Sequence, residues 1–131
     1  MRPIITILFL FVYTLSACGQ KTPAQNGQIA KDVDVAEFAK LIKSKPGQLL
    51  DVRTKGEVAK GAIAGSQNID LFDENFEAKI EKLDKSKPVY VYCASGGRSG
   101  EAMEMMQKKG FKEVYNLDGG YNAWKKASEQ K

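Results

Sequence analysis

The fold is decided by the stretch from residue 90 to residue 99, which reads Tyr90-Val91-Tyr92-Cys93-Ala94-Ser95-Gly96-Gly97-Arg98-Ser99. The apolar and aromatic residues before Cys93 are typical of a buried strand, and the small residues after it predict a tight loop that leads into a helix. The loop N–H groups and the helix N-terminus would then surround the thiol, an arrangement that stabilises a thiolate or a bound anion. The stretch therefore predicts an active site in which Cys93 is the reactive group.

Strand and helix patterns alternate on both sides of this stretch. Short apolar runs predict strands at residues 28–33, 48–53, 89–92 and 111–117, with a further extended piece within 61–69. Capping residues and apolar spacing predict helices after Asp34, over 72–83 and 99–109, and after Gly120, and a turn or short helix over 54–60. This order predicts an α/β domain with a mainly parallel central sheet and helices on both faces. Reactive groups in such domains lie at the carboxyl ends of strands, where Cys93 is expected.

The first 17 residues differ in composition from the rest of the chain. Arg2 is followed by an almost wholly apolar run from Ile4 to Leu15, which is shorter than the ~20 residues of a membrane-spanning helix. This pattern is typical of a signal peptide, with an uncleaved membrane helix or a fragment of core as the alternative. The sequence Leu15-Ser16-Ala17-Cys18 resembles the lipobox of bacterial lipoproteins. The resemblance implies cleavage before Cys18 and lipidation of its sulfur.

Three segments are therefore expected along the chain. They are a lipoprotein signal peptide at residues 1–17, the lipidated cysteine with a flexible tether at 18–28, and a globular domain at 29–131. Gly19, in place of an aspartate after the cysteine, resembles the sorting pattern for the outer membrane. The localisation implied is that of an exported bacterial lipoprotein on the periplasmic face of the outer membrane, attached to the membrane through its N-terminal lipid.

Length and charge narrow the classes of partner. A chain of 131 residues is long enough for one small domain with a targeting segment and too short for two ordinary domains. The net charge is +4, but basic and acidic residues alternate from Lys31 onward without a basic block. A nucleic-acid partner is therefore not expected, and we expect a monomer.

The chain has two cysteines and no histidine. Once Cys18 is lipidated, Cys93 is the sole thiol, which in an exported protein indicates a reactive thiol or an intermolecular bridge. The lack of histidine excludes a Cys-His pair and a Ser-His-Asp triad and removes nearly all common zinc sites. No metal site and no cofactor are expected. The thiol has to be activated by the loop and by the charge of Arg98, with Glu101 facing solvent.

Two more segments accompany the loop, and the three together carry a family resemblance. They are Leu50-Asp51-Val52-Arg53 with Glu57 and the run 61–69, then Cys93-Ala94-Ser95-Gly96-Gly97-Arg98-Ser99 with Gly110-Phe111, and then Asn116-Leu117-Asp118-Gly119-Gly120-Tyr121-Asn122-Ala123-Trp124. In this order they resemble a single-domain rhodanese of the thiosulfate sulfurtransferase family, so that residues 29–131 would form a rhodanese-like domain. The chain departs from the family at Ala62, where histidine is usual, and at Val58, where an aromatic residue is common.

The resemblance implies covalent catalysis by Cys93. The thiolate would attack the outer sulfur of a sulfane donor such as thiosulfate and become a persulfide, and a thiol or cyanide acceptor would then remove that sulfur. Asp51 and Arg53 would support the loop from a neighbouring strand end. Donor and persulfide would be bound by the loop residues Ala94, Ser95, Gly96, Gly97, Arg98 and Ser99.

Other interpretations stay open for the same loop. Four residues separate Cys93 from Arg98, whereas cysteine-dependent phosphatases and arsenate reductases have five, so the shorter loop favours sulfur over phosphate. A rhodanese-like sulfur carrier or partner-binding module with little turnover is a second class. A redox thiol is disfavoured because the domain has no resolving cysteine. Cys93 can also be interpreted as a small buried apolar residue.

Residues outside the loop are expected to have structural roles. Met103, Met105 and Met106 offer thioethers that copper(I) prefers, but their helical spacing favours packing. Tyr121 and Trp124 are expected to pack from the last helix, and residues 125–131 to form a solvated, frayed end.

Overall fold

The computed structural model describes residues 27–130. The expected signal peptide, Cys18 and most of the expected tether lie outside these residues. No helix within residues 27–130 is long and apolar enough to cross a membrane.

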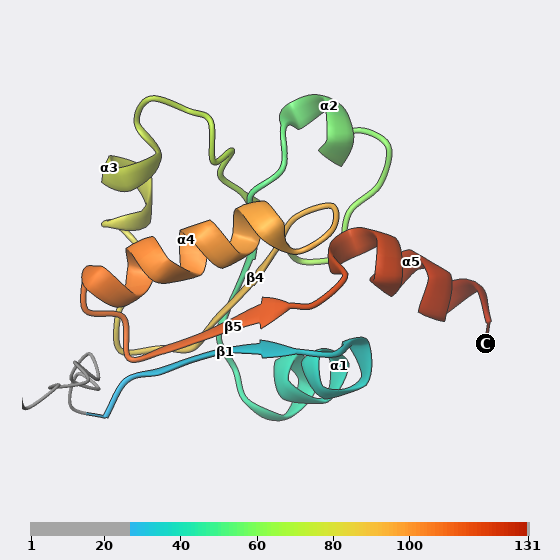
Figure 1. Ribbon diagram of the computed structural model, residues 1–131, viewed down its shortest axis with the longest axis horizontal. Coiled ribbons are helices and arrows are strands. Elements are labelled where there is room, and N and C mark those ends of the chain that lie inside the picture. The colour runs from blue at the N-terminus through green and yellow to red at the C-terminus, as the bar shows by residue number, and fades with distance from the viewer. Residues whose placement is uncertain (1–26, 131) are drawn as a thin grey trace, which may run out of the picture.

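A sheet of five parallel strands forms the centre of the molecule (Figure 1). Its strands in chain order are β1 (Ile29–Val33), β2 (Gln48–Asp51), β3 (Gln67–Asn68), β4 (Val89–Tyr92) and β5 (Glu113–Leu117). The order across the sheet is β1-β5-β4-β2-β3, so β4 lies between β5 and β2 at the middle. This arrangement confirms the expected α/β fold with a parallel sheet. It also places the end of β4, and with it Cys93, among the ends of its two neighbours.

Helices cover both faces of the sheet. The helices are α1 (Val35–Ser44), α2 (Lys55–Val58), α3 (Phe76–Ile80), α4 (Gly97–Lys108) and α5 (Gly120–Glu129). Because successive side chains of a strand point to opposite faces, β4 contributes to two cores. Val89, Val91 and Cys93 pack with α3 and α4, whereas Tyr90 and Tyr92 pack with α1 and α5. Cys93 therefore lies on the α4 side of the sheet.

The core on the α1 side is largely aromatic. Phe38 meets Tyr90 and Trp124 edge-to-face, with ring centroids 5.9 Å and 6.2 Å apart, and Tyr90 stacks on Tyr115 at 5.6 Å. Such pairs add about 0.5–1.5 kcal/mol each beyond the burial of their area. The packing role expected of Trp124 is confirmed.

The methionines belong to the core on the α4 side. Met106 is fully buried, and Met103 and Met105 are partly buried against the same cluster. Their expected packing role is confirmed.

The helix expected over residues 72–83 is shorter than the apolar spacing predicted. The structure forms α3 only from Phe76 to Ile80, and Phe72 is 71% exposed. The side chains of Asp70 and Asp73 accept hydrogen bonds from the backbone N–H groups two residues further on, at Phe72 and Asn75. These local bonds stabilise turns in place of a first helical turn, so the prediction for Phe72 was wrong.

The C-terminal segment also differs from its expectation. Residues 125–129 continue α5, so they are solvated but not frayed.

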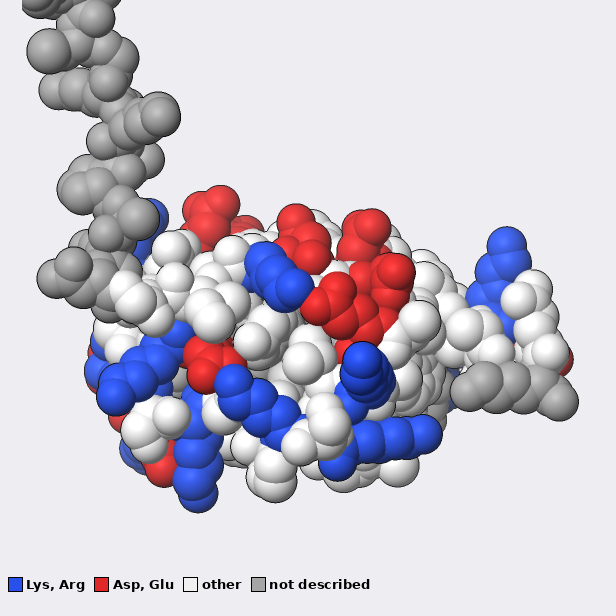
Figure 2. All heavy atoms as spheres, turned by 90° about the horizontal axis from the view of Figure 1, so that it is seen from below, with Lys and Arg blue, Asp and Glu red and all other residues white. Residues whose placement is uncertain are grey.

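Charged side chains of both signs share the surface. Figure 2 shows the molecule from below Figure 1, with basic and acidic side chains on the same face and neutral residues between them. Several exposed charges are paired, including Lys31 with Glu37 and Lys45 with Glu113. Exposed pairs of this kind each contribute at most about 1 kcal/mol to stability.

Candidate active site

The loop that follows β4 surrounds the thiol of Cys93. The residue is only 1% exposed, and its Sγ accepts a hydrogen bond of 3.0 Å from the backbone N–H of Gly96. Gly96 has φ of +107°, a left-handed conformation that glycine adopts without a steric penalty. This conformation turns the chain back over the sulfur and lets α4 begin at Gly97. The thiol consequently lies at the N-terminus of a 12-residue helix.

Two opposing effects set the pKa of the Cys93 thiol. Burial is the largest and raises the pKa, because it removes the thiolate from water. Hydrogen bonds from the Ser99 hydroxyl and from the backbone N–H groups of Ser99, Gly96 and Ser95 lower it. Together the hydrogen bonds outweigh burial, and the pKa of Cys93 lies below its ordinary value. The thiolate of Cys93 therefore forms more readily than that of an ordinary cysteine, without a neighbouring base.

Side chains from other elements hold the turn of this loop. The Gly96 carbonyl accepts hydrogen bonds from the Ser99 hydroxyl at 3.2 Å and from Asn116 Nδ2 at 3.1 Å. Asn116, on β5, also donates to Asp32 Oδ1 on β1 at 2.7 Å. Side chains from α4, β5 and β1 thus hold the Gly96 carbonyl in place. The backbone N–H of the same residue donates to the Cys93 sulfur.

The first turn of α5 holds the other side of the loop. The backbone N–H groups of Tyr121 and Asn122 donate to the carbonyls of Cys93 and Ala94, at 2.8 Å and 3.0 Å. Gly120 lies so close that a Cβ at this position would be 2.6 Å from the same backbone atoms. The close approach of α5 therefore depends on a glycine at this position.

Arg98 is bound to a carboxylate from α2. Its Nη1 and Nη2 donate to Glu57 Oε2 and Oε1 at 2.8 Å and 2.7 Å, a bidentate pair. Hydrogen bonds from Arg98, with smaller contributions from those of Thr54, lower the pKa of Glu57 to about 2, although partial burial opposes this. The pKa of Arg98 is raised, chiefly by Glu57 and to a smaller extent by Cys93. The positive charge of Arg98 is thus largely balanced in the free protein.

Phe72 lies beside the same guanidinium. Its ring centroid is 5.9 Å from Arg98 Cζ, within the range of a cation–π contact. Phe72, which was expected within a helix and is exposed instead, therefore lies at the rim of the Cys93 loop.

Asp51 and Arg53 form a buried pair at the end of β2. Asp51 Oδ2 accepts from Arg53 Nη2 at 2.6 Å, and the same nitrogen donates to the Gly61 carbonyl at 2.8 Å. The guanidinium also lies over the ring of Tyr121, 4.2 Å from its centroid. None of their hydrogen bonds within residues 27–130 reaches the loop from Ala94 to Ser99. Their support is indirect, through the Gly61 turn and through Tyr121.

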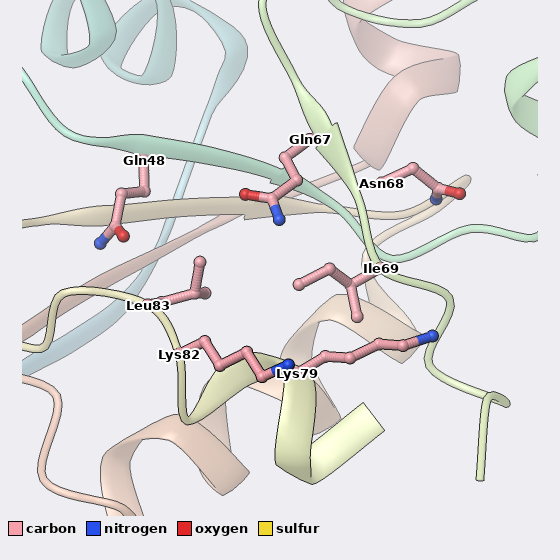
Figure 3. Close-up of a pocket in the computed structure, with 7 residues that line it drawn as sticks. All are labelled: Gln48, Gln67, Asn68, Ile69, Lys79, Lys82 and Leu83. Atoms are coloured by element: carbon pink, nitrogen blue, oxygen red, sulfur yellow. The ribbon is translucent and has the colours of Figure 1, made fainter. Parts of the chain in front are cut away.

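A polar hollow at the edge of the sheet is a separate feature (Figure 3). It has a volume of about 450 Å³ and is lined by residues of β2, β3 and the segment around α3. Two of its amides are already bonded, since Gln48 pairs with the backbone of Asp84 and Asn68 donates to the carbonyls of Asp51 and Arg53. One of its lysines, Lys79, pairs with Asp73. This hollow contains no residue of the Cys93 loop.

Of the loop residues expected from the sequence, Ser95, Gly96, Arg98 and Ser99 interact with the Cys93 sulfur. The structure also adds contributors that the sequence did not indicate as partners of the loop, namely Asn116 and the carboxylate of Glu57. The pattern Thr54-x-x-Glu57 correctly predicted the capping box of α2. The second contact of Glu57, with a residue 41 positions away, has no local signal. Glu101 is exposed, as expected. Within residues 27–130, no group of three or more His, Cys, Asp or Glu side chains is placed to bind a metal.

Comparison with known proteins identifies relatives across most of the chain. The family model described as "Rhodanese-like domain" matches residues 34–127, which include Glu57, the Cys93 loop and Asn116. The uncharacterized protein YqhL of Bacillus subtilis is 39% identical over 80 residues, covering 61% of this chain and 62% of YqhL. The thiosulfate sulfurtransferase GlpE of Shewanella oneidensis is 32% identical over 98 residues, covering 75% of this chain and 95% of GlpE. The crystal structure of a rhodanese-like domain protein from Staphylococcus aureus matches with a TM-score of 0.64 and 30% identity, covering 72% of this chain and 90% of that protein.

Proposed function

Because this chain belongs to the rhodanese-like domain family, we propose that it is a sulfurtransferase that carries a sulfane sulfur on Cys93 as a persulfide. The observation that supports this most directly is the thiol itself. Cys93 lies at a strand end, and its Sγ accepts a hydrogen bond of 3.0 Å from the Gly96 N–H. The pKa of its thiol is lowered although the chain contains no histidine. GlpE, similar along most of its length, is named a thiosulfate sulfurtransferase.

The first half of the reaction loads the sulfur. The Cys93 thiolate attacks the outer sulfur of a donor such as thiosulfate, the bond between the two donor sulfurs breaks, and sulfite leaves with the electron pair. The product is a Cys93 persulfide whose terminal sulfur carries the negative charge. The loop N–H groups are placed to stabilise this charge, since they form a concavity of donors at a helix N-terminus.

The second half unloads it. A thiophilic acceptor attacks the terminal sulfur, the bond to Cys93 Sγ breaks, and the thiolate of Cys93 returns as the leaving group. A thiolate with a lowered pKa is a better leaving group, so the same hydrogen bonds assist both halves. No oxidant is consumed, and the two half-reactions predict ping-pong kinetics.

Arg98 is proposed to bind the anionic donor at the edge of the loop. Its pairing with Glu57 fixes the direction of the guanidinium, and its remaining N–H groups stay available as donors. The fixed side chain orders the approach of the donor, while the balanced charge limits the strength of binding.

The domain is further proposed to be held at a membrane by a lipid on Cys18. This proposal is supported by the sequence alone, through the apolar run from Ile4 to Leu15 and the lipobox-like residues before Cys18. Two or more acyl chains give stable anchoring, whereas one is marginal. The thiol of Cys93 would then work outside the cytoplasm as the sole free cysteine.

The test of the sulfurtransferase proposal uses the full chain purified in detergent. Thiosulfate and cyanide are expected to give thiocyanate, and thiosulfate alone to add the mass of one sulfur atom to the peptide that contains Cys93. Cys93→Ser should abolish both signals, while Ser86→Ala, a change at an exposed serine outside the site, should leave both intact. A wild-type chain that neither turns over nor gains the sulfur would rule the proposal out.

A further inference from the structure

A second hollow opens directly beside the catalytic loop, between α2 and α5. Its volume is about 220 Å³, and it is lined by Arg53, Glu57, Lys60, Ala94, Tyr121, Asn122 and Lys125. We refer to it as the lysine pocket. A thiosulfate ion would fill only part of it.

The charges that line the lysine pocket leave a positive excess. Arg53 is neutralised by Asp51, and Glu57 is neutralised by Arg98. Lys60 makes no ion pair with any residue of the described range 27–130, and Lys125 has only a 3.9 Å contact with Glu129 along its own helix. Two ammonium groups are thus available to a ligand. The pocket consequently favours an anion.

Two walls of the lysine pocket adjoin the loop that follows Cys93. Ala94 directly follows Cys93, and its carbonyl is bonded to the N–H of Asn122, another wall residue. Glu57, on the α2 side, holds Arg98 at the other end of the loop. A ligand bound between these walls lies next to the loop that presents the persulfide.

The polar floor of the lysine pocket is rigid. The Arg53 guanidinium donates hydrogen bonds to Asp51 and to the Gly61 carbonyl. It also lies over the rings of Tyr121 and Tyr92, 4.2 Å and 5.5 Å from their centroids. Because Asp51 and the Gly61 carbonyl already accept hydrogen bonds from Arg53, they are not free to pair with Lys60 or Lys125.

We propose that the lysine pocket binds the acceptor of the sulfur, and that this acceptor is a small thiol carrying a carboxylate. The inference rests on the proposed sulfurtransferase function and adds to it the chemical class of the acceptor. The carboxylate pairs with Lys60 and Lys125, and the thiol of the same molecule reaches the persulfide past Ala94. The acceptor thiolate attacks the terminal sulfur, the bond to Cys93 Sγ breaks, and a persulfide of the acceptor leaves.

The test compares two thiols that differ in one charge. N-acetylcysteine carries a carboxylate and N-acetylcysteine amide does not, and each is used as acceptor with thiosulfate as donor and the full chain as enzyme. The wild type is expected to have a lower KM for N-acetylcysteine. Lys60→Ala and Lys125→Ala should each raise that KM by about two- to fivefold, the size of a partly exposed ion pair. The KM for the amide and the KM for thiosulfate in the cyanide assay should not change.

The matched control is Lys82→Ala, which removes a lysine from the separate hollow of Figure 3. It should leave the KM for both thiols at the wild-type value. Equal KM values for the two thiols in the wild type, or the same loss in Lys82→Ala as in Lys60→Ala, would overturn the inference.

A binding measurement separates this inference from the proposed function. S-methylglutathione carries carboxylates and has no free thiol, so it can bind but cannot accept sulfur. Its addition should shift the amide resonances of Lys60, Ala94 and Asn122 in the wild type and not in the Lys60→Ala, Lys125→Ala double variant. If these shifts appear in a chain that gives no thiocyanate, the anion site stands and the sulfurtransferase proposal fails. If thiocyanate forms and the shifts are absent, the acceptor site fails alone.

Discussion

The reactivity of Cys93 depends on hydrogen bonds that compete with burial. Burial alone would raise the pKa of the thiol and keep it protonated at neutral pH. The donors that reverse this effect are backbone N–H groups of the loop and one hydroxyl, that of Ser99. That hydroxyl bonds the Gly96 carbonyl at 3.2 Å and can rotate toward the sulfur when the thiolate forms. Ser99 is therefore the side chain through which the activation can be tested.

Ser99→Ala should slow the alkylation of Cys93 at neutral pH. The change removes one donor to the thiolate, so the pKa of Cys93 rises and the reactive fraction at pH 7 falls. A hydrogen bond to a charged group is worth about 1.5–3 kcal/mol, and we expect the rate with iodoacetamide to fall roughly tenfold. Above the pKa both proteins are fully ionised, so the two rates should converge at high pH. The measurement is the alkylation rate of the Cys93 peptide against pH.

Ser95→Ala is the control for that measurement. Ser95 acts on the thiol through its backbone N–H, which alanine retains, and its side chain is exposed. Its rate profile should match the wild type. An unchanged profile for Ser99→Ala would show that the hydroxyl does not bond the thiolate.

Individual site residues differed in how far the sequence could predict them. Cys93 and the glycines of its loop were predictable because their chemistry is local, with a thiol, a turn and a helix start within ten residues. Asn116 and Glu57 were not predictable as partners of the loop, because each contacts it across 20 residues or more. Those contacts depend on the order of strands in the sheet, which local spacing does not contain.

At the scale of elements, α2 links the cap of a short helix to the catalytic loop. Glu57 Oε2 accepts from the Thr54 N–H at 3.0 Å and from Arg98 Nη1 at 2.8 Å. One carboxylate thus caps a helix of four residues and pairs with the arginine of another element. A helix this short is not stable by itself, so its position depends on this pair.

Glu57→Gln should reduce stability at neutral pH and have little effect in acid. The ordinary pKa of the group is 4.5 and its pKa in the folded protein is about 2. A lowered pKa means that the ion pair stabilises the protein fully above pH 4.5 and loses this effect as the pH falls towards 2. The side chains are 33% and 24% exposed, so solvent screening limits the contribution to about 1 kcal/mol. Urea unfolding at pH 7 and pH 2.5 measures the difference between variant and wild type.

Glu101→Gln provides the comparison, because this glutamate is exposed and makes no ion pair within residues 27–130. Its difference from the wild type should be near zero at both pH values. A deficit for Glu57→Gln that is as large at pH 2.5 as at pH 7 would contradict the proposed role of the charge.

Gly120→Ala should destabilise the contact between α5 and the end of β4. Gly120 has φ of +58°, and an added Cβ would be 2.6 Å from backbone atoms of Cys93 and Ala94. Left-handed strain and overpacking together are expected to cost about 2–4 kcal/mol. Gly56→Ala, in α2, has an ordinary φ and open space around it, so it should be neutral or slightly stabilising. The measurement is the free energy of unfolding of the two variants by chemical denaturation. Equal values for Gly120→Ala and Gly56→Ala would refute the packing argument.

Helices and strands were predicted correctly where no nearby side chain stabilises a different backbone conformation. The apolar run of β4 and the caps of α1 and α2 predicted these elements correctly, since the capping side chains bond the backbone of their own helix. The start expected for α3 at Phe72 was wrong, because Asp70 and Asp73 bond nearby N–H groups and favour turns. The apolar spacing of Phe72, Phe76 and Ile80 did not reveal this competition.

At the scale of the whole molecule, strand order assembles the site. Because β4 lies between β5 and β2, Asn116 from one neighbour and the segment after Asp51 from the other meet at the end of β4. The two faces of β4 then separate the roles of its side chains. The face with Cys93 packs on α4, whose N-terminus serves the thiol, and the face with Tyr92 packs towards α5, which borders the lysine pocket. The thiol that reacts with the sulfur donor and the proposed acceptor site thus both lie at the carboxyl ends of the strands.

The proposed lipid anchor belongs to the same scale, since it would determine where the whole domain works. Cys18→Ser removes the sulfur that the lipobox-like sequence would present for lipidation. We expect this variant to lose acylation and to leave the membrane fraction, because binding by acyl chains disappears with the chains. Cys93→Ser is the control, since it also replaces a cysteine but should remain acylated and membrane-bound. The measurements are the mass of the N-terminal peptide and the distribution between membrane and soluble fractions. If Cys18→Ser stays fully in the membrane fraction, the apolar run from Ile4 to Leu15 acts as an uncleaved helix and the lipid proposal is wrong.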